Sequence, residues 1–267
     1  MNLIDFHTHA FPDALAARAM PVLEAEGKIK AALDGTVGAL RKSMDATGVG
    51  ASVLCSIATK PAQFGTILKW SSEIRSDCII PFPSVHPADP MAVPHVREVH
   101  AAGFKGIKLH PYYQEFDVDE ARLFPIYAEA QRLNLLVVCH TGFDIAFPRV
   151  DKGNAERIRR VIDLFPTLKF VTTHMGAWEN WDEVRRFLLG RPVLMETSFS
   201  ANVMDAAAMR GMLMAHPPEY VLFGSDSPWL DQGASIAALR ELDLGADRER
   251  LLFYENARRL LDLPARP

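Results

Sequence analysis

Two histidines near the start of the chain have a spacing that suits metal binding. His7 and His9 lie in the stretch Asp5-Phe6-His7-Thr8-His9, at the end of a short run that begins with Leu3 and Ile4 and is predicted as a β-strand. Side chains two residues apart on a strand point to the same side, so both imidazoles can reach one ion. Neutral imidazole is a common ligand of divalent metals. An H-x-H pair also arises by chance, so its meaning depends on the residues that accompany it.

Other polar side chains with metal-binding or acid–base chemistry follow short apolar runs. His110, His140 and His174 each stand at the end of such a run, and Asp226 follows Val221-Leu222-Phe223-Gly224-Ser225. An ionised carboxylate there is costly unless it is paired or metal-bound. The alternative is a purely structural role, in which each histidine is hydrogen-bonded in the core or a loop and Asp226 starts a turn in Ser-Asp-Ser-Pro. The ligand set that combines three histidines with one aspartate suits Zn²⁺, and Mn²⁺, Fe²⁺ and Co²⁺ also fit it: His7, His9, His140 and Asp226.

Eight apolar segments predict the strands that must position these residues. Their nearly continuous apolar character is typical of strands buried on both faces, as in a parallel sheet. The predicted strands are Leu3–His7, Ala51–Ile57, Ile79–Val85, Gly106–His110, Leu135–His140, Leu168–His174, Val193–Thr197 and Tyr220–Asp226.

The intervening segments have the apolar spacing of amphipathic helices. Gly48 and Gly103 follow two of them as stop signals, and Gly190 follows a third. The predicted helices are Val37–Thr47, Ala62–Ser76, Pro90–Ala102, Glu120–Leu133, Asn154–Phe165, Trp178–Leu189, Ala201–Ala215, Ala234–Leu242 and Arg248–Leu261.

Eight strand–helix repeats in 267 residues predict an α/β fold, a single (β/α)8 TIM barrel that covers residues 1–267 as one domain. A doubly wound open sheet is the competing arrangement, but it usually has fewer strands and a switch point. In a barrel the C-terminal ends of all strands meet at one mouth. We therefore expect the metal site at these C-terminal ends.

Composition limits the classes of partner. The net charge of −4 gives no electrostatic footprint for nucleic acid or an anionic membrane, and no apolar run has the length of a membrane span. Three scattered cysteines without CxxC pairing indicate neither a disulfide framework nor a thiolate zinc site. We expect a cytoplasmic protein with a small-molecule substrate, no nucleic-acid partner and no membrane; homo-oligomerisation stays open.

Five motifs together resemble the amidohydrolase superfamily, in the amidohydrolase-related branch that contains aminocarboxymuconate-semialdehyde decarboxylase. They occur in the family's order and span nearly the whole chain. The motifs are Asp5-Phe6-His7-Thr8-His9-Ala10-Phe11-Pro12, Gly106-Ile107-Lys108-Leu109-His110-Pro111, Val138-Cys139-His140-Thr141-Gly142, Thr173-His174-Met175-Gly176 and Phe223-Gly224-Ser225-Asp226-Ser227-Pro228-Trp229.

The resemblance implies a role for each of these polar residues. It implies that His7, His9, His140 and Asp226 hold one ion, for which we favour Zn²⁺, and that His174 acts beside it as a proton carrier or orienting group. Lys108 raises an alternative. In dinuclear members such as dihydroorotase, a lysine in a similar context is carboxylated and bridges two ions, and His140 and His174 would then serve the second ion. Lys108 could instead bind a substrate carboxylate, or be structural with only its head in solvent.

We expect a metal-dependent hydrolase that uses a metal-activated water on a small amide, lactone or cyclic ester. Asp226 would accept the proton of the water, with His174 assisting. The alternative is non-oxidative decarboxylation of a small carboxylic acid, which the same branch also performs. Its decarboxylases generally carry inserted segments near the mouth, so this compact chain favours hydrolysis. A third hypothesis is a non-catalytic barrel whose metal is structural and closed by four protein ligands.

Substrate contacts are expected from side chains that follow the strands. Lys108, His110, Tyr112, Trp178 and Trp229 are predicted to bind an anionic or aromatic substrate. The alternative for the three aromatic side chains is that they only pack the loops. Glu196-Thr197-Ser198 has no definite role. Four histidines lack strand-end support and are not predicted as ligands: His86, His95, His100 and His216.

Overall fold

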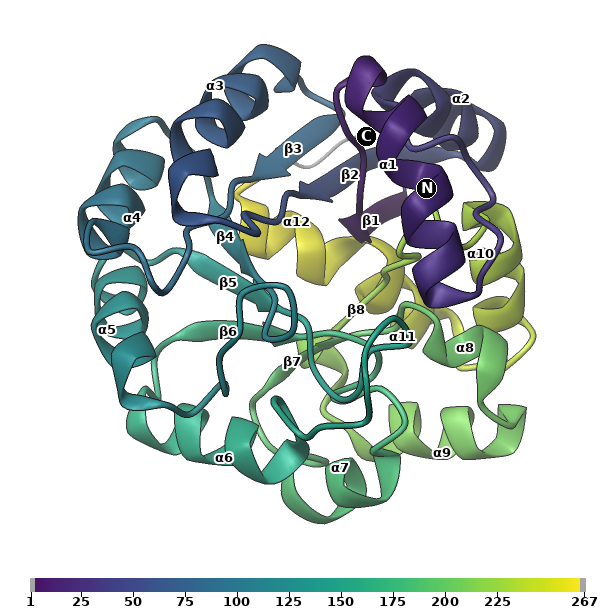
Figure 1. Ribbon diagram of the computed structural model, residues 1–267. Helices are drawn as coiled ribbons and strands as arrows, with labels where there is room; N and C mark the ends of the chain where they lie inside the picture. Colours follow the sequence, from purple (N-terminus) through teal and green to yellow (C-terminus); the bar gives the residue numbers. More distant parts are fainter. Residues whose placement is uncertain (1–2, 265–267) are drawn as a thin grey trace.

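All eight predicted strands are present in the computed structural model, which describes residues 3–264. The strands form a ring, and the helices surround it (Figure 1). Their bounds are β1 Leu3–Thr8, β2 Val49–Cys55, β3 Ile79–Phe82, β4 Gly106–Leu109, β5 Leu136–Cys139, β6 Lys169–Thr172, β7 Leu194–Glu196 and β8 Val221–Leu222.

Parallel pairing links the strands in chain order. The continuous ladders form one sheet of β1-β2-β3 and another of β4-β5-β6-β7-β8. Isolated bridges join their edges, between Ser84 and Lys108 on one side and between Thr8 and Ser227 on the other. The Phe6 amide also donates to the Phe223 carbonyl at 2.7 Å. This order of strands is that of the predicted (β/α)8 barrel.

Alternate residues of each strand face the interior of the ring and the helices. On β1, Ile4 and Phe6 belong to the inner apolar cluster, whereas Leu3 belongs to the outer cluster beneath the helices. Ala257 and Leu261 of the last helix join the inner cluster with Ile4. Burial on both faces explains why the strands are apolar almost without interruption.

Most helices cover the outside of the ring in chain order, whereas α12 lies across one end of the ring (Figure 1). Short 3-10 turns at Pro61–Gln63, Ala121–Leu123 and Pro218–Tyr220 precede three of the elements, and a π-helical segment at Leu251–Glu255 links the last two helices. The helices are α1 Asp13–Gly27, α2 Val37–Thr47, α3 Phe64–Ile74, α4 Ala92–Ala101, α5 Phe124–Arg132, α6 Ala155–Leu164, α7 Trp181–Phe187, α8 Ser200–Val203, α9 Ala206–Ala215, α10 Gln232–Arg240, α11 Ala246–Arg250 and α12 Asn256–Leu261.

Three helices differ from the sequence prediction, one of them being Arg248–Leu261, which the π-helical segment divides into α11 and α12. The prediction omitted α1, which contains Pro21 and has no side-chain cap at its start. The predicted single helix Ala201–Ala215 is wrong, because Met204 is extended and the Asp205 side chain caps a new helix by accepting from the Ala208 amide. A side-chain cap of this kind starts a helix wherever the preceding backbone is extended.

Several predicted strands extend too far at their C-terminal ends. His110, His140, His174 and Asp226 lie just beyond β4, β5, β6 and β8. His174 and Asp226 have φ of 56° and 62°, a left-handed conformation that no strand continues through. The polar residues therefore belong to the loops at the mouth, although the apolar runs lead directly into them.

Among the residues that the structure describes, no helix is both long enough and apolar enough to span a membrane. Cys55, Cys78 and Cys139 are all free thiols.

A buried carboxylate joins α4 to α5 and should make stability depend on acid pH. Glu129 accepts from Arg97 at 2.6 Å and from Arg132 at 2.7 Å, and these two guanidinium groups lower the pKa of Glu129 to about 2. A lowered pKa adds stability above the ordinary value of 4.5, and that stability is lost as the pH falls toward 2. Because both arginines are exposed to solvent, we expect Glu129→Gln to lower the free energy of unfolding at neutral pH by roughly 0.5–1 kcal/mol.

Urea unfolding of the two proteins at several pH values measures this difference. The difference should narrow as the pH falls from 4.5 toward 2. A difference that is the same at neutral and acid pH would show that Glu129 stabilises the fold by packing and not by its charge.

Candidate metal centre

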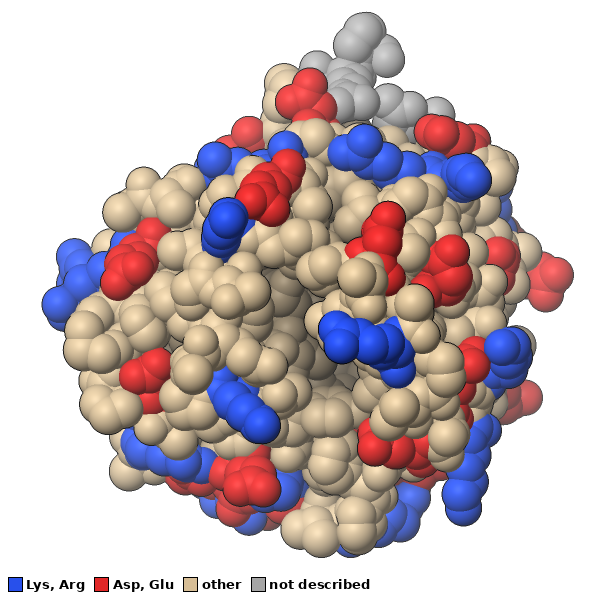
Figure 2. All heavy atoms as spheres, turned by 45° about the horizontal axis from the view of Figure 1, so that its top comes forward, with Lys and Arg blue, Asp and Glu red and all other residues tan. Residues whose placement is uncertain are grey.

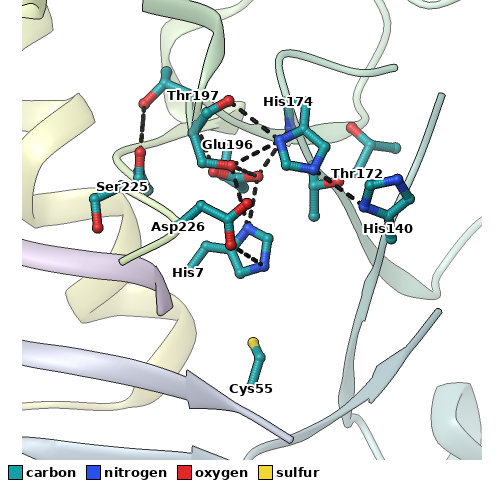
Figure 3. A network of polar contacts seen from close by, with 12 residues as sticks. His7, Cys55, His140, Thr172, His174, Glu196, Thr197, Ser225 and Asp226 are labelled. Carbon is teal, nitrogen blue, oxygen red and sulfur yellow. Dashed lines mark hydrogen bonds and ion pairs between the residues drawn. The ribbon is translucent and has the colours of Figure 1, made fainter. Parts of the chain in front are cut away.

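The mouth of the barrel gathers polar side chains from β1 and from the loops after β5, β6, β7 and β8. Figure 3 shows His7, Glu196, His174 and Asp226 in one network of contacts, with His140 joined to it through His174. The strand-end histidines and the aspartate are therefore brought together as predicted.

His7, His9 and Asp226 point metal-binding atoms at one position. His7 Nε2 and His9 Nε2 lie 3.0 Å apart, which agrees with the prediction that the two rings share one side of the strand. Asp226 Oδ1 lies 3.1 Å from His9 Nε2 and 3.5 Å from His7 Nε2. The three atoms form a group compact enough for a single ion.

Hydrogen bonds on the far side of each ring fix which nitrogen faces the mouth. His9 Nδ1 lies 2.7 Å from the Cys55 carbonyl, and His7 Nδ1 lies 3.1 Å from Glu196 Oε1. Because a carbonyl and a carboxylate only accept, we assign the proton of each ring to Nδ1. Both Nε2 atoms then present lone pairs, which is the usual arrangement of histidines that bind metals.

Asp226 supplies the negative charge of this group. Its side chain is 7% exposed, and Oδ1 has no hydrogen-bond partner among the described residues. Burial opposes its charge, and protons on the surrounding His7, His9 and His174 would hold the pKa of this carboxyl well below its ordinary value. With these rings neutral, a cation has to compensate the charge instead. A buried carboxylate oxygen without a donor, next to two lone pairs, fits a divalent cation.

His140 and His174 form a second pair of facing lone pairs. His174 Nε2 lies 3.2 Å from His140 Nδ1. The other nitrogen of each ring lies near a carbonyl, that of Ser198 at 3.2 Å for His174 and that of Phe143 at 3.0 Å for His140. Burial lowers the pKa of both rings to about 3, so neither carries a charge at neutral pH. This pair also has the geometry of metal ligands.

Lys108 lies beside the first group and is fully buried. Its Nζ is 2.9 Å from His7 Nε2, and none of its surface is exposed. The alternative in which Lys108 is structural with its head in solvent is therefore wrong. Both remaining alternatives, carboxylation between two ions and contact with a substrate carboxylate, agree with this position.

A third cluster was only partly predicted. His110 Nε2 and His140 Nε2 lie 3.3 Å and 3.7 Å from Asp144 Oδ2, and the two rings are stacked with centroids 4.3 Å apart. His140 therefore belongs to a compact group with His110 and Asp144, separate from that of His7, His9 and Asp226. Burial lowers the pKa of His110 to about 4. Asp144 follows no apolar run, so strand-end reasoning could not find it.

Glu196 supports the metal-facing histidines from below. It is fully buried on β7, and its Oε1 accepts from the His174 amide at 2.9 Å and lies 3.1 Å from His7 Nδ1. Ser198 donates to it through both the amide and the hydroxyl. Its position at the C-terminal end of a predicted strand was the signal for this role, although the sequence alone gave it no partner.

Asp5 connects the first strand to the loop that carries Asp226. Its carboxylate accepts from the Ser225 amide at 3.0 Å and from Gln232 Nε2 at 2.8 Å, while the Asp226 amide donates to the His7 carbonyl at 2.8 Å. Burial raises the pKa of Asp5 to about 6. These contacts explain how a residue 219 positions from His7 in the chain reaches the same ion site.

The polar cluster forms the floor of a cavity of about 840 Å³. Figure 2 shows a hollow in this face whose edges are mostly uncharged. Lys108, His110, Trp178 and Trp229 line the cavity, as expected for residues that contact a substrate. Tyr112 does not line it, because its hydroxyl donates to the Gly142 and Val150 carbonyls inside the β5–α6 loop. The neighbouring Tyr113 lines the cavity instead.

The histidines that were not predicted as ligands have other surroundings in the structure. His95 stacks on Phe64, and His216 contacts the Val193 carbonyl at 2.9 Å. His86 Nδ1 accepts from the Ala88 amide, and His100 lies on α4.

Comparison with known proteins identifies the family of this chain. A family model described as amidohydrolase matches residues 4–263. The chain belongs to the amidohydrolase family. That match confirms the resemblance based on the five motifs, and with it the nature of the protein as an enzyme. A search of curated proteins found no match.

Solved structures of low sequence identity share the fold of this amidohydrolase. An uncharacterised TIM-barrel protein from Bordetella bronchiseptica has a TM-score of 0.80 at 20% identity, over 98% of this chain and 99% of its own. A 5-carboxyvanillate decarboxylase from Novosphingobium aromaticivorans with bound manganese has a TM-score of 0.71 at 17% identity, over 98% and 97%. A Pseudomonas putida protein assigned as a 2-pyrone-4,6-dicarboxylic acid hydrolase has a TM-score of 0.68 at 17% identity, over 98% and 97%. The TIM-barrel prediction is confirmed.

Glu196→Gln should weaken metal binding without unfolding the barrel. The substitution keeps the size of the side chain but removes the negative charge that orients His7 and raises its basicity. Loss of such a supporting carboxylate typically lowers metal affinity by about 10- to 100-fold. Competition with a chromophoric chelator measures this affinity, and circular dichroism checks the fold.

The same substitution at a distant carboxylate, Glu129→Gln, is the matched control and should leave metal affinity unchanged. A folded Glu196→Gln protein with unaltered affinity would show that this carboxylate only stabilises the loops.

Proposed function

We propose that this amidohydrolase uses a divalent metal ion to hydrolyse a small amide, lactone or cyclic ester. The observation that carries the proposal is the convergence of His7 Nε2, His9 Nε2 and Asp226 Oδ1 on one position at the floor of the cavity. These atoms open onto the cavity, whereas a structural metal site is normally closed by four protein ligands. The arrangement therefore favours catalysis over a structural metal.

The number of ions depends on His140, His174 and Lys108. With one ion, His140 would move its Nδ1 toward His7 and His9 to complete the set of His7, His9, His140 and Asp226. With two ions, His140 and His174 would hold the second and a carboxylated Lys108 would bridge them. His140 Nδ1 and His174 Nε2 lie 3.2 Å apart, and Lys108 is fully buried beside His7. Both observations support a site that can bind either one ion or two.

Zn²⁺ is the ion that we propose, because histidine and carboxylate ligands with an open position are typical of catalytic zinc. The same donors also suit Mn²⁺, which is bound in the related decarboxylase from Novosphingobium aromaticivorans. Affinity measurements with both ions would decide between them.

Four side chains of the site would take part in hydrolysis. A divalent ion contributes Lewis acidity, which polarises a substrate carbonyl and makes water more acidic. Asp226 is the group that would take the proton of the attacking water at Oδ1 or Oδ2. His174 is neutral and can hold that proton in transit to the leaving group, because its Nε2 faces the site. Lys108 Nζ and His110 are placed to hold a polar group of the substrate.

Decarboxylation is the second candidate, and Lys108 is the observation that favours it. A buried lysine cation 2.9 Å from His7 Nε2 is suited to hold a substrate carboxylate next to the ion. The structural relatives do not separate the two reactions, because the decarboxylase and the hydrolase are both covered over 97% of their length. The compactness of this chain therefore gives no preference for hydrolysis.

Asp226→Asn should abolish turnover. The amide cannot take a proton from water and is a weaker metal ligand, so we expect a loss of at least about 1,000-fold in kcat. Screening of amides, lactones and benzoate-type acids with the Zn²⁺- and Mn²⁺-loaded enzyme, with product analysis for CO₂, identifies the reaction. A variant with near-normal turnover would exclude Asp226 as the proton acceptor.

Metal removal tests the metal requirement directly. Prolonged dialysis against a chelator should remove turnover and leave the barrel folded, because the apolar clusters inside and outside the ring do not depend on the ion. Metal content after reloading in bicarbonate should be two ions per chain if Lys108 is carboxylated, and one in Lys108→Met. Turnover that survives complete metal removal would contradict the proposed function.

A further inference from the structure

Helix α1 turns a second apolar face toward the cavity above the metal centre. Ala16 and Met20 are buried against the barrel. Leu15, Ala19 and Val22, which recur at positions i, i+4 and i+7 on another side, line the cavity above the metal centre. Apolar side chains on two faces also explain why the sequence of α1 shows no single amphipathic stripe.

Helix α3 contributes a matching face to the same cavity. Thr66, Ile67 and Trp70 recur at helical spacing along α3 and line the cavity together with the residues of α1. Ile145 in the β5–α6 loop adds a further apolar wall. The upper part of the cavity is therefore a mainly apolar groove between two helices, which we call the α1–α3 groove.

Exposure of the apolar side chains increases from the floor of the cavity to its rim. Trp178 near the floor is 7% exposed, whereas Leu15, Ile145 and Val22 are 41%, 48% and 55% exposed. These three are among the eight large apolar side chains that are exposed in the described part of the chain. An exposed apolar cluster that continues into a cavity is typical of a ligand-binding surface.

The volume of the cavity supports the same conclusion. About 840 Å³ lies in the upper part of the range of pockets that enclose drug-sized ligands. The same cavity reaches His7, His9 and Asp226, so whatever fills the α1–α3 groove can be one molecule with its reacting group at the metal centre. A single-ring acid or lactone held there would leave Leu15, Val22 and Ile145 uncovered.

We propose that the substrate carries an extended acyl chain, which lies in the α1–α3 groove while its hydrolysable or acidic end reaches the metal centre. This inference rests on the proposed function, since it names the substrate class of that site. The groove contributes affinity by removing apolar surface from water on both the ligand and the rim.

A homologous series of alkyl hydroxamic acids tests the inference, because the head group binds metal ions and the chain length varies. With the Zn²⁺-loaded enzyme, calorimetry should show an affinity that rises about two- to fourfold for each added methylene until the groove is filled. An affinity that does not change from acetohydroxamic to decanohydroxamic acid would overturn the proposal.

Two charged variants locate the effect. Leu15→Asp and Val22→Asp should each lower the affinity for decanohydroxamic acid at least tenfold and leave that for acetohydroxamic acid unchanged. Val203→Asp is the matched control, because Val203 is 58% exposed and does not line the cavity. If all three substitutions lower the affinity for decanohydroxamic acid equally, or if none of them lowers it, the ligand does not lie in a groove between α1 and α3.

The metal-free protein separates this proposal from the proposed function. Decanoic acid should still bind to it in competition with a fluorescent apolar probe, and Val22→Asp should abolish that binding. If the affinity rises with chain length but the protein binds no metal, the metal centre is refuted and the substrate proposal stands. If instead no chain binds and sedimentation shows that Val22→Asp dissociates an oligomer, the apolar rim is an interface between copies and the substrate proposal is wrong.

Discussion

The site depends on one constraint: several buried lone pairs face each other with no proton between them. His7 and His9 each direct Nδ1 at an acceptor, so their Nε2 atoms, 3.0 Å apart, repel each other unless a cation lies nearby. In this structure the Lys108 ammonium donates to His7 Nε2 at 2.9 Å. A divalent ion satisfies both rings and Asp226 together, which one lysine cannot. The fold therefore holds together groups that repel each other until an ion binds between them.

The barrel provides the rigidity that this arrangement needs. Glu196 is buried inside the ring and contacts His7, His174 and Ser198 at once, so a shift of β7 would move ligands on two other elements. Gly224 makes room for it, since a Cβ there would lie 2.0 Å from Glu196 Oε2. His174 and Asp226 adopt left-handed backbone, which costs free energy for non-glycine residues and persists where surrounding contacts enforce it. Strain of this kind concentrates at functional sites, in agreement with the proposed roles.

Most of the fold and the metal-facing residues follow from the sequence, because both depend on local patterns. Apolar runs specify strands buried on two faces, and each polar residue at the end of such a run reaches the mouth. The roles of residues that depend on contacts between distant segments could not be predicted in this way. Glu196 has no local signal beyond its place at a strand end. Asp144 contacts His110 and His140 only because a loop brings it to them. Helix α1 was missed for a related reason. Its second apolar face is exposed toward a cavity, and sequence periodicity assumes one buried face.

The charge state of the resting site bears on the choice between hydrolysis and decarboxylation. Burial keeps His110, His140 and His174 neutral at neutral pH, because it lowers the pKa of these rings to about 3 or 4. Groups with such a low pKa are weak bases. Hydrolysis begins with removal of a proton from water, and such weak bases can accept that proton only if a metal ion makes the water more acidic. Decarboxylation must end with delivery of a proton to carbon, so the same groups would first have to acquire one. Either reaction therefore needs a bound ion at this site, and the buried Lys108 is the feature that a decarboxylation mechanism would need most.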